Sequence, residues 1–170
     1  LESPERQPLL ACADPTDRMA CTSAVVGRFA KRAFRRSLEA GELARLLRPA
    51  EAAWAEGLGF EDGVRLVFQS ILLSPHFLFR PELDPDPTSL TPRRLNGFEL
   101  ASRLSYFLWS SMPDEELFAV ASKGELHRSD VLKKQVARML ADPKRRTLVE
   151  NFTGQWLQLR NLSSIAPDKG

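Results

Sequence analysis

The sequence predicts an all-α fold built from two consecutive small helical units, of about three and four helices, packed as an array of helical bundles. Three observations support this fold class. Apolar residues recur at three- and four-residue spacing through most of the chain, which is typical of amphipathic helices. No segment shows the two-residue alternation of a half-buried strand. A stretch rich in proline and aspartate, residues 81–93, separates the two units.

The composition limits the classes of function. The 170 residues are 43% hydrophobic and 27% charged, which is ordinary for a globular protein. A net charge of +2 is too small to indicate a nucleic-acid partner by itself. No apolar run approaches the roughly 18 residues that a membrane span requires. The chain starts LESPERQP and ends IAPDKG, so we expect it to be a fragment whose missing signal peptide says nothing about compartment.

The first unit is expected over residues 17–80, after an irregular segment at 1–16. Its helices should run from about 17 to 34, from 40 to 55, and onward from near residue 60. Each helix has an apolar face at helical spacing, made of Val26, Phe29, Ala30 and Ala33, of Leu43, Leu46, Leu47 and Trp54, and of Val64, Val67, Phe68, Ile71 and Leu72. These faces predict one shared core for the three helices.

The second unit is expected over residues 94–170. Asn96 and Glu99 stand three residues apart and predict a capping box, in which each side chain bonds a backbone N–H of the other residue. The helix that follows has an apolar face of Leu100, Leu104, Phe107 and Leu108. The next helix is expected at about 113–122, with Gly124 closing it.

Two further helices are expected in this unit. Ser129 should cap a helix at 130–140, whose inward side is made of Leu132, Val136, Met139 and Leu140. A last helix at about 143–159 should bury a stripe of Leu148, Phe152, Trp156 and Leu159. Gly154 interrupts this helix and indicates the close approach of another helix; room for a ligand is the less favoured alternative.

The linker at 81–93 contains four prolines and three acids. Asp84 and Asp86 could suggest calcium, but the glycine and the terminal glutamate of an EF-hand loop are missing. The segment is therefore interpreted as an acidic, turn-rich linker.

A basic cluster lies at the end of the first helix and has two interpretations. It consists of Arg28, Lys31, Arg32, Arg35 and Arg36. It could contact phosphate groups or a nucleic acid. The favoured alternative is a solvated last turn, partly paired with Glu39 and Glu42, because no aromatic residues interleave the cations as a stacking platform requires.

His76 follows Ser74 and Pro75, which predict a short extra helical turn. It could ligate a metal or a haem, but no second ligand stands three or four residues away. We therefore favour a structural histidine beside Phe77 and Phe79.

No catalytic motif accompanies these residues: the sequence contains neither a G-x-S-x-G elbow nor a P-loop, and His127 is expected at the surface. Aromatic residues such as Trp109 and Trp156 more often belong to a core than to a sugar-binding platform. An exposed tryptophan would change that interpretation. No catalytic, cofactor-binding or metal-binding residue is predicted.

The two cysteines, Cys12 and Cys21, fit neither a zinc site nor a C-x-x-C-H haem attachment motif. A disulfide would tie the N-terminal segment to the first helix and would indicate an oxidising compartment. Two unpaired thiols are equally compatible with the spacing.

Several motifs resemble those of one family: RFAKRAFRRSL (28–38), LVFQSILLSPHFLFRPE (66–82), ELASRLSYFLWSSMPDEEL (99–117), QVARMLADPKRRTLVENFTGQWLQLRNL (135–162) and the closing Pro167-Asp168. The family is the planctomycete-type secreted, cytochrome-like proteins, built from serial domains of unknown function that often accompany a c-type cytochrome module. Residues 12–80 resemble the shorter helical domain of that series, and residues 92–170 resemble the first part of the longer domain that follows. Ser37 departs from the family, which usually has proline there.

The resemblance implies export to an extracytoplasmic location, periplasmic, secreted or at the cell surface, which favours a Cys12–Cys21 disulfide. It supplies no catalytic residues. Because C-x-x-C-H is absent, no haem is expected in this fragment, although a c-type haem is expected elsewhere in the full-length protein. The expected partners are neighbouring domains of the same chain, including a c-type cytochrome domain.

Three functions remain, in order of preference. The first is a non-catalytic scaffold or interaction module that serves extracytoplasmic electron transfer. The second is part of a cell-surface polysaccharide-active enzyme whose site is completed by C-terminal domains, and an exposed Trp109 or Trp156 would support it. The third is nucleic-acid binding through the Arg28–Arg36 cluster.

Overall fold

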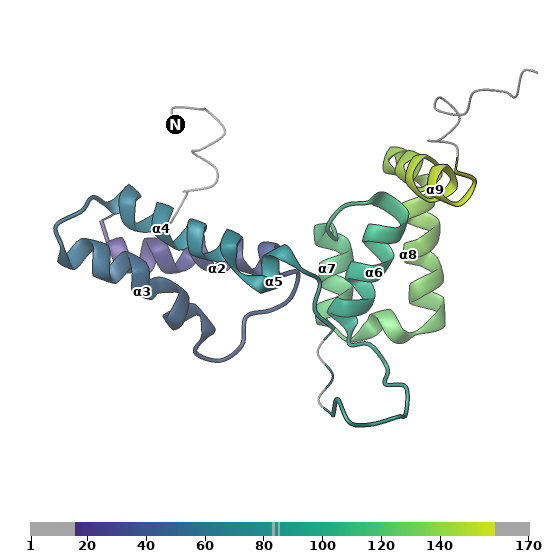
Figure 1. Cartoon of the computed structure of the whole chain (residues 1–170), viewed down its shortest axis with the longest axis horizontal. Helices are drawn as coiled ribbons and strands as arrows, with labels where there is room; N and C mark the ends of the chain where they lie inside the picture. The colour runs from purple at the N-terminus through teal and green to yellow at the C-terminus, as the bar shows by residue number, and fades with distance from the viewer. Residues whose placement is uncertain (1–15, 83, 85, 159–170) are drawn as a thin grey trace, which may run out of the picture. The chain divides into compact units, whose positions relative to one another are not determined.

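A computed structural model describes residues 16–82, 84 and 86–158 (Figure 1). The chain divides between Leu83 and Asp84 into two compact units. Every regular element in the described ranges is helical and none is a strand, which confirms the predicted all-α fold. Among these elements, no helix combines the length and the apolarity that crossing a bilayer requires.

The first unit begins with α2 (Arg18–Phe34). Asp17 caps this helix, because its carboxylate accepts a hydrogen bond from the Ala20 N–H at 2.9 Å. The helix ends at Arg35, which adopts a left-handed conformation with φ 57°. Both ends lie where the sequence predicts them.

Helices α3 (Glu42–Ala55) and α4 (Phe60–Leu73) pack against each other and against α2. Their shared core consists of Val26, Ala30, Ala33, Phe34, Leu47, Ala50, Val67 and Ile71. The prediction for Leu72 is wrong, since this side chain is 39% exposed at the last turn of α4. Next in the chain, the hydroxyl of Ser74 caps the short helix α5 (Pro75–Leu78).

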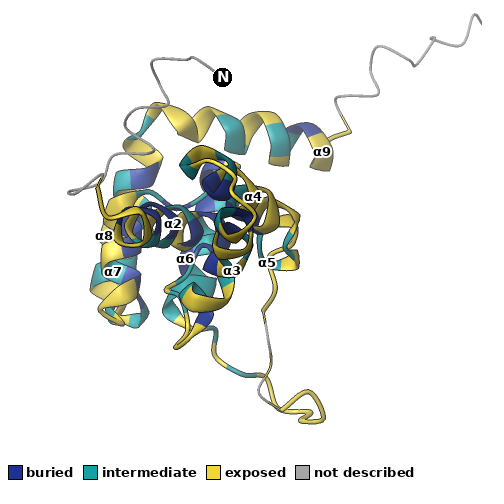
Figure 2. Cartoon of the chain, turned by 90° about the vertical axis from the view of Figure 1, so that its left-hand side faces the viewer, coloured by how far each residue is buried: buried dark blue, intermediate teal, exposed yellow. Residues whose placement is uncertain are grey.

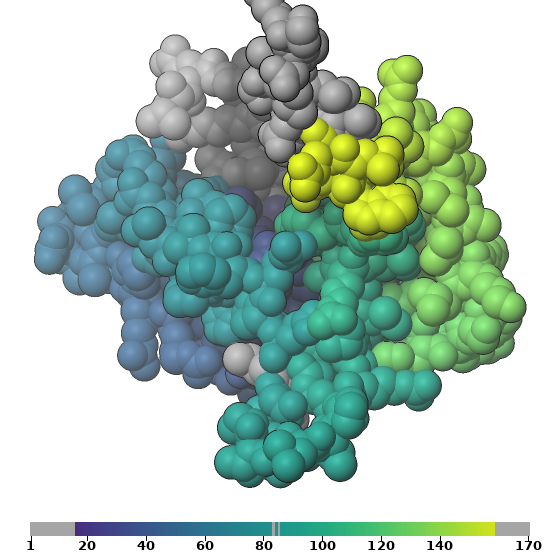
Figure 3. Space-filling view, turned by 45° about the vertical axis from the view of Figure 1, so that its right-hand side comes forward, coloured from purple at the N-terminus to yellow at the C-terminus, as the bar shows by residue number. Residues whose placement is uncertain are grey.

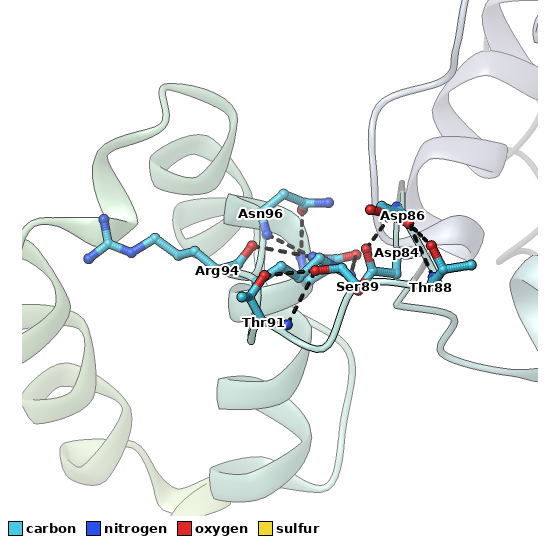
Figure 4. Close-up of polar contacts among 9 residues, drawn as sticks. Asp84, Asp86, Thr88, Ser89, Thr91, Arg94 and Asn96 are labelled. Atoms are coloured by element: carbon cyan, nitrogen blue, oxygen red, sulfur yellow. Dashed lines mark hydrogen bonds and ion pairs between the residues drawn. The ribbon is translucent and has the colours of Figure 1, made fainter.

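In the second unit, hydrogen bonds accepted by side chains form tight turns in the segment before the first helix (Figure 4). The Asp84 carboxylate accepts from the Asp86 N–H at 3.0 Å. The Asp86 carboxylate accepts from the Thr88 N–H and hydroxyl at 3.1 and 2.6 Å. These bonds leave the two aspartates engaged in turns of the backbone.

Helix α6 (Gly97–Trp109) starts with the predicted capping box between Asn96 and Glu99. Its inward side consists of Ala101, Ser105, Leu108 and Trp109. Phe107 was predicted to be inward but is 54% exposed. The helix ends at Ser110 in a left-handed conformation.

Asp114 caps α7 (Glu115–Ser122), and Gly124 follows it with φ 71°. A 3₁₀ turn, η1 (Glu125–His127), leads to α8 (Ser129–Ala141). Ser129 was predicted to cap α8 but is its first helical residue, and Arg128 holds the cap position without a side-chain bond. The core of the unit consists of Ala101, Leu108, Trp109, Leu117, Ala121, Leu126 and Met139.

The last segment differs from the regular helix predicted at 143–159. It comprises a 3₁₀ turn η2 (Pro143–Arg145), a π-helix η3 (Leu148–Thr153) and a final helical turn α9 (Gly154–Trp156). Leu159 lies outside the described residues. Figure 2 shows that this segment is largely exposed along its length. Leu140, at the end of α8 before it, is 41% exposed and not inward as predicted.

Candidate interaction site

Three aromatic side chains of the second unit form an exposed surface that we call the aromatic face: Phe107, Phe152 and Trp156. They are 54%, 49% and 75% exposed. The Phe107 and Phe152 rings meet edge to face with centroids 5.6 Å apart, and the Phe152 and Trp156 rings stack at 6.0 Å. Both spacings are those of favourable aromatic pairs, so the rings support one another although they are open to solvent.

Polar bonds fix the segment that carries two of these rings. The Thr147 hydroxyl donates to the Lys144 carbonyl at 2.8 Å. The Asn151 amide donates to the Ser110 hydroxyl at 2.8 Å, which joins η3 to the end of α6. In Figure 3 the yellow end of this segment lies at the front surface. The bond from Asn151 therefore anchors the segment that carries Phe152 and Trp156 to the end of α6.

The sequence predicted a buried stripe where the structure has the aromatic face. The four-residue spacing of Leu148, Phe152 and Trp156 correctly indicated one apolar side of a helix, but spacing does not show whether a neighbour covers that side. Only Leu148 packs against the core of the unit. Among the described residues, no atom outside the local helix backbone lies within 4 Å of the place of an added Cβ on Gly154, so the described part of the chain shows no close approach of another helix there.

Trp109 does not share this exposure. It is 2% exposed, and its indole N–H donates to the Met139 carbonyl at 2.9 Å. The Lys144 ammonium lies 4.8 Å from the centre of its ring. Trp109 is therefore a hydrogen-bonded core residue and cannot serve as an exposed platform.

The basic cluster of the first unit is divided by the structure. Arg35 is buried, at 7% exposure, and its guanidinium donates to the carbonyls of His76, Phe77 and Phe79. These are carbonyls at the end of α5, so Arg35 closes that helix. Arg28, Lys31 and Arg32 are exposed on the last turns of α2.

Arg36 forms a two-bond ion pair with Glu42, at 2.8 and 2.9 Å. The hydrogen bonds from Arg36 hold the pKa of the Glu42 carboxyl below its usual value, against the opposing effect of burial. The Glu39 N–H also donates to this carboxylate. The expected pairing with Glu42 is thus present, and it occupies Arg36 within the turn between α2 and α3.

His76 lies beside Phe34, with ring centroids 5.4 Å apart. No group of three or more histidine, cysteine or acidic side chains that could hold a metal occurs in the described part of the chain. His127 was expected at the surface and is half-buried in η1. Sequence spacing could not place either histidine, because both positions depend on tertiary packing.

Cys21 is 4% exposed and lies in a small core with Val25 and Val64. Cys12 lies outside the described residues. The disulfide between them stays a prediction.

Asp114 is a well-connected carboxylate of the second unit. Its oxygens accept two hydrogen bonds from Arg138, at 2.6 and 3.0 Å, and one from the Leu117 N–H at 2.9 Å. Partial burial opposes ionisation, but the bonds from Arg138 and Leu117 together outweigh it and lower the pKa of Asp114. This arrangement stabilises a helix start and leaves no proton to donate at neutral pH.

These features define an all-α protein of two small helical units with an exposed aromatic surface on the second. Residues 21–82 match the family model PSD5, described as a protein of unknown function (DUF1595). Residues 95–170 match PSD4, also described as a protein of unknown function (DUF1592). The chain therefore contains these two domains in succession. Comparisons with curated proteins and with solved structures gave no match.

Proposed function

We propose that the chain is a non-catalytic helical interaction module, and that the aromatic face of its second domain contacts the partner. The observation that carries this proposal is the aromatic face itself: three rings, each about half exposed or more, on a segment fixed by hydrogen bonds. Exposed aromatic clusters are typical of surfaces that bind another molecule.

The environments of the best-connected carboxylates support a non-catalytic role. Glu42, Glu99 and Asp114 each accept paired hydrogen bonds from an arginine and also cap or close a turn. The pKa of each lies below its usual value. A general acid at neutral pH requires the opposite shift. These carboxylates therefore serve structure.

The partner that we propose is a c-type cytochrome module of the same exported protein, so that the chain serves extracytoplasmic electron transfer. The resemblance to secreted, cytochrome-like proteins supports this partner. A Cys12–Cys21 disulfide would fit the same extracytoplasmic location.

The test is a haem assay on the full-length protein that we propose contains this chain (the longer protein), purified from an exporting host. We expect the absorbance bands of a c-type haem and haem that stays attached to the polypeptide on denaturing gels. A longer protein without covalent haem would refute the cytochrome partner. A haem-loaded protein in which Phe152→Ala and Trp156→Ala leave the contact between modules intact would refute the role of the aromatic face.

A second candidate is carbohydrate binding as part of a polysaccharide-active enzyme. The observation in its favour is Trp156, which is 75% exposed and stacked on Phe152, since sugar rings pack on exposed indoles. Titration with soluble oligosaccharides by calorimetry would test it. Binding that Trp156→Ala abolishes would favour this candidate over the first.

A further inference from the structure

Cations are concentrated at one end of the segment that carries the aromatic face. Lys144, Arg145 and Arg146 precede Val149, and Glu150 is the only acid between residues 143 and 158. All three cations are exposed. Val149, which follows them, is itself 63% exposed. The exposed side of this segment is therefore positively charged near its N-terminal end and apolar in its C-terminal part.

Two of these cations are held in place. The Arg145 guanidinium donates to the carbonyls of Leu140 and Ala141 at 3.1 and 3.3 Å, at the end of α8. The Lys144 ammonium lies over the Trp109 ring. These contacts restrict the two side chains, which lowers the entropy that a partner must remove on binding.

We infer that the partner presents an acidic protein surface: an apolar patch that covers the aromatic face, with carboxylates placed against Lys144, Arg145 and Arg146. This inference rests on the proposed function and specifies the chemistry of its partner. Charge complementarity of this kind sets specificity and the association rate. We choose a protein surface because carboxylates at fixed positions on a folded partner can match cations that are themselves bonded to the domain.

The test is calorimetric titration of the full chain with the c-type cytochrome module of the longer protein. We expect the dissociation constant to rise about tenfold between 50 and 500 mM NaCl, because salt screens charges at an interface. The charge reversal Lys144→Glu/Arg145→Glu/Arg146→Glu should weaken binding about tenfold at low salt. Arg146→Glu alone should weaken it less, and it removes no internal bond that the structure shows. Lys133→Glu/Lys134→Glu, on the exposed side of α8, is the matched control and should leave affinity unchanged.

The outcomes separate this inference from the proposed function. No binding by the wild-type chain overturns both. Binding that requires Trp156 but is insensitive to salt and to charge reversal overturns the acidic partner surface and leaves the docking role standing. Tighter binding to vesicles of phosphatidylglycerol than to the cytochrome module overturns the choice of a protein partner.

Discussion

Arg35 ends one helix of the first domain and closes another. Its left-handed backbone terminates α2, while its buried guanidinium serves the last carbonyls of α5. Sequence reasoning placed it in a solvated basic cluster because four neighbouring cations have the same charge. Arg35 is buried and Arg32 is exposed. This difference arises from tertiary packing, and the pattern of charges in the sequence does not show it.

Arg35→Ala should lower the free energy of unfolding of the first domain by about 1–3 kcal/mol, because it leaves carbonyls at the end of α5 without their donor. Urea unfolding with hydrogen exchange of peptides from residues 60–82 would measure this. Lys31→Ala, at an exposed position one turn earlier, is the control and should change stability little. Equal effects of the two variants would contradict the assigned role of Arg35.

Asp114 should make the stability of the second domain depend on pH. Its pKa is lower in the folded domain than the usual value of about 3.9, so its stabilising effect is complete above that value and is lost as the pH falls through the folded pKa. Asp114→Asn should cost about 1 kcal/mol at pH 7. The difference in free energy of unfolding between wild type and Asp114→Asn should become smaller as the pH falls below about 3.9.

Urea unfolding of wild type and Asp114→Asn at pH 7 and at a series of acidic pH values measures how this stabilisation depends on pH. Glu150→Gln is the control, since its side chain is exposed in the same domain. If the difference in free energy of unfolding between wild type and Asp114→Asn does not change with pH, the ion pair with Arg138 does not stabilise the domain.

At the scale of the elements, two glycines in helices of the second domain should respond oppositely to alanine. A Cβ on Gly97 would lie 2.7 Å from the Ala121 carbonyl, so Gly97→Ala should force α6 and α7 apart at a cost of about 1–3 kcal/mol. The added Cβ of Gly154→Ala meets no described atom outside its own helical turn within 4 Å, so this variant should stabilise the last segment by about 0.5–1 kcal/mol. Urea denaturation followed by circular dichroism would compare them, and a change of the same sign in both would contradict the described packing.

Helix positions were largely predictable from the sequence, because the signals are local. The capping box at Asn96 and Glu99 and the cap at Asp17 depend on neighbouring residues alone. The π-helix at Leu148–Thr153 was not predictable, since its support comes from α6, distant in sequence. The aromatic face was missed for a related reason. Helical spacing identifies the apolar side of a helix but does not show whether a neighbouring element packs on it.

At the scale of the whole molecule, the predicted disulfide should stabilise the first domain. A bridge closing the short loop between Cys12 and Cys21 is worth about 2–3 kcal/mol in the chain-entropy model. Reduction, or Cys12→Ser, should therefore lower the melting temperature of the oxidised protein, and reducing agent should have no further effect on the Cys12→Ser variant. Mass spectrometry after alkylation checks the premise: two alkylated thiols in the protein from an exporting host would refute the bridge.

The central claim is that a partner covers the aromatic face in the longer protein. Hydroxyl-radical footprinting of Trp156, read by mass spectrometry, tests it directly. In the chain of residues 1–170 Trp156 is 75% exposed and should be oxidised readily, while buried Trp109 reacts slowly and serves as an internal control. We predict that Trp156 is strongly protected in the haem-loaded longer protein. Equal oxidation rates of Trp156 in the two proteins would contradict the claim.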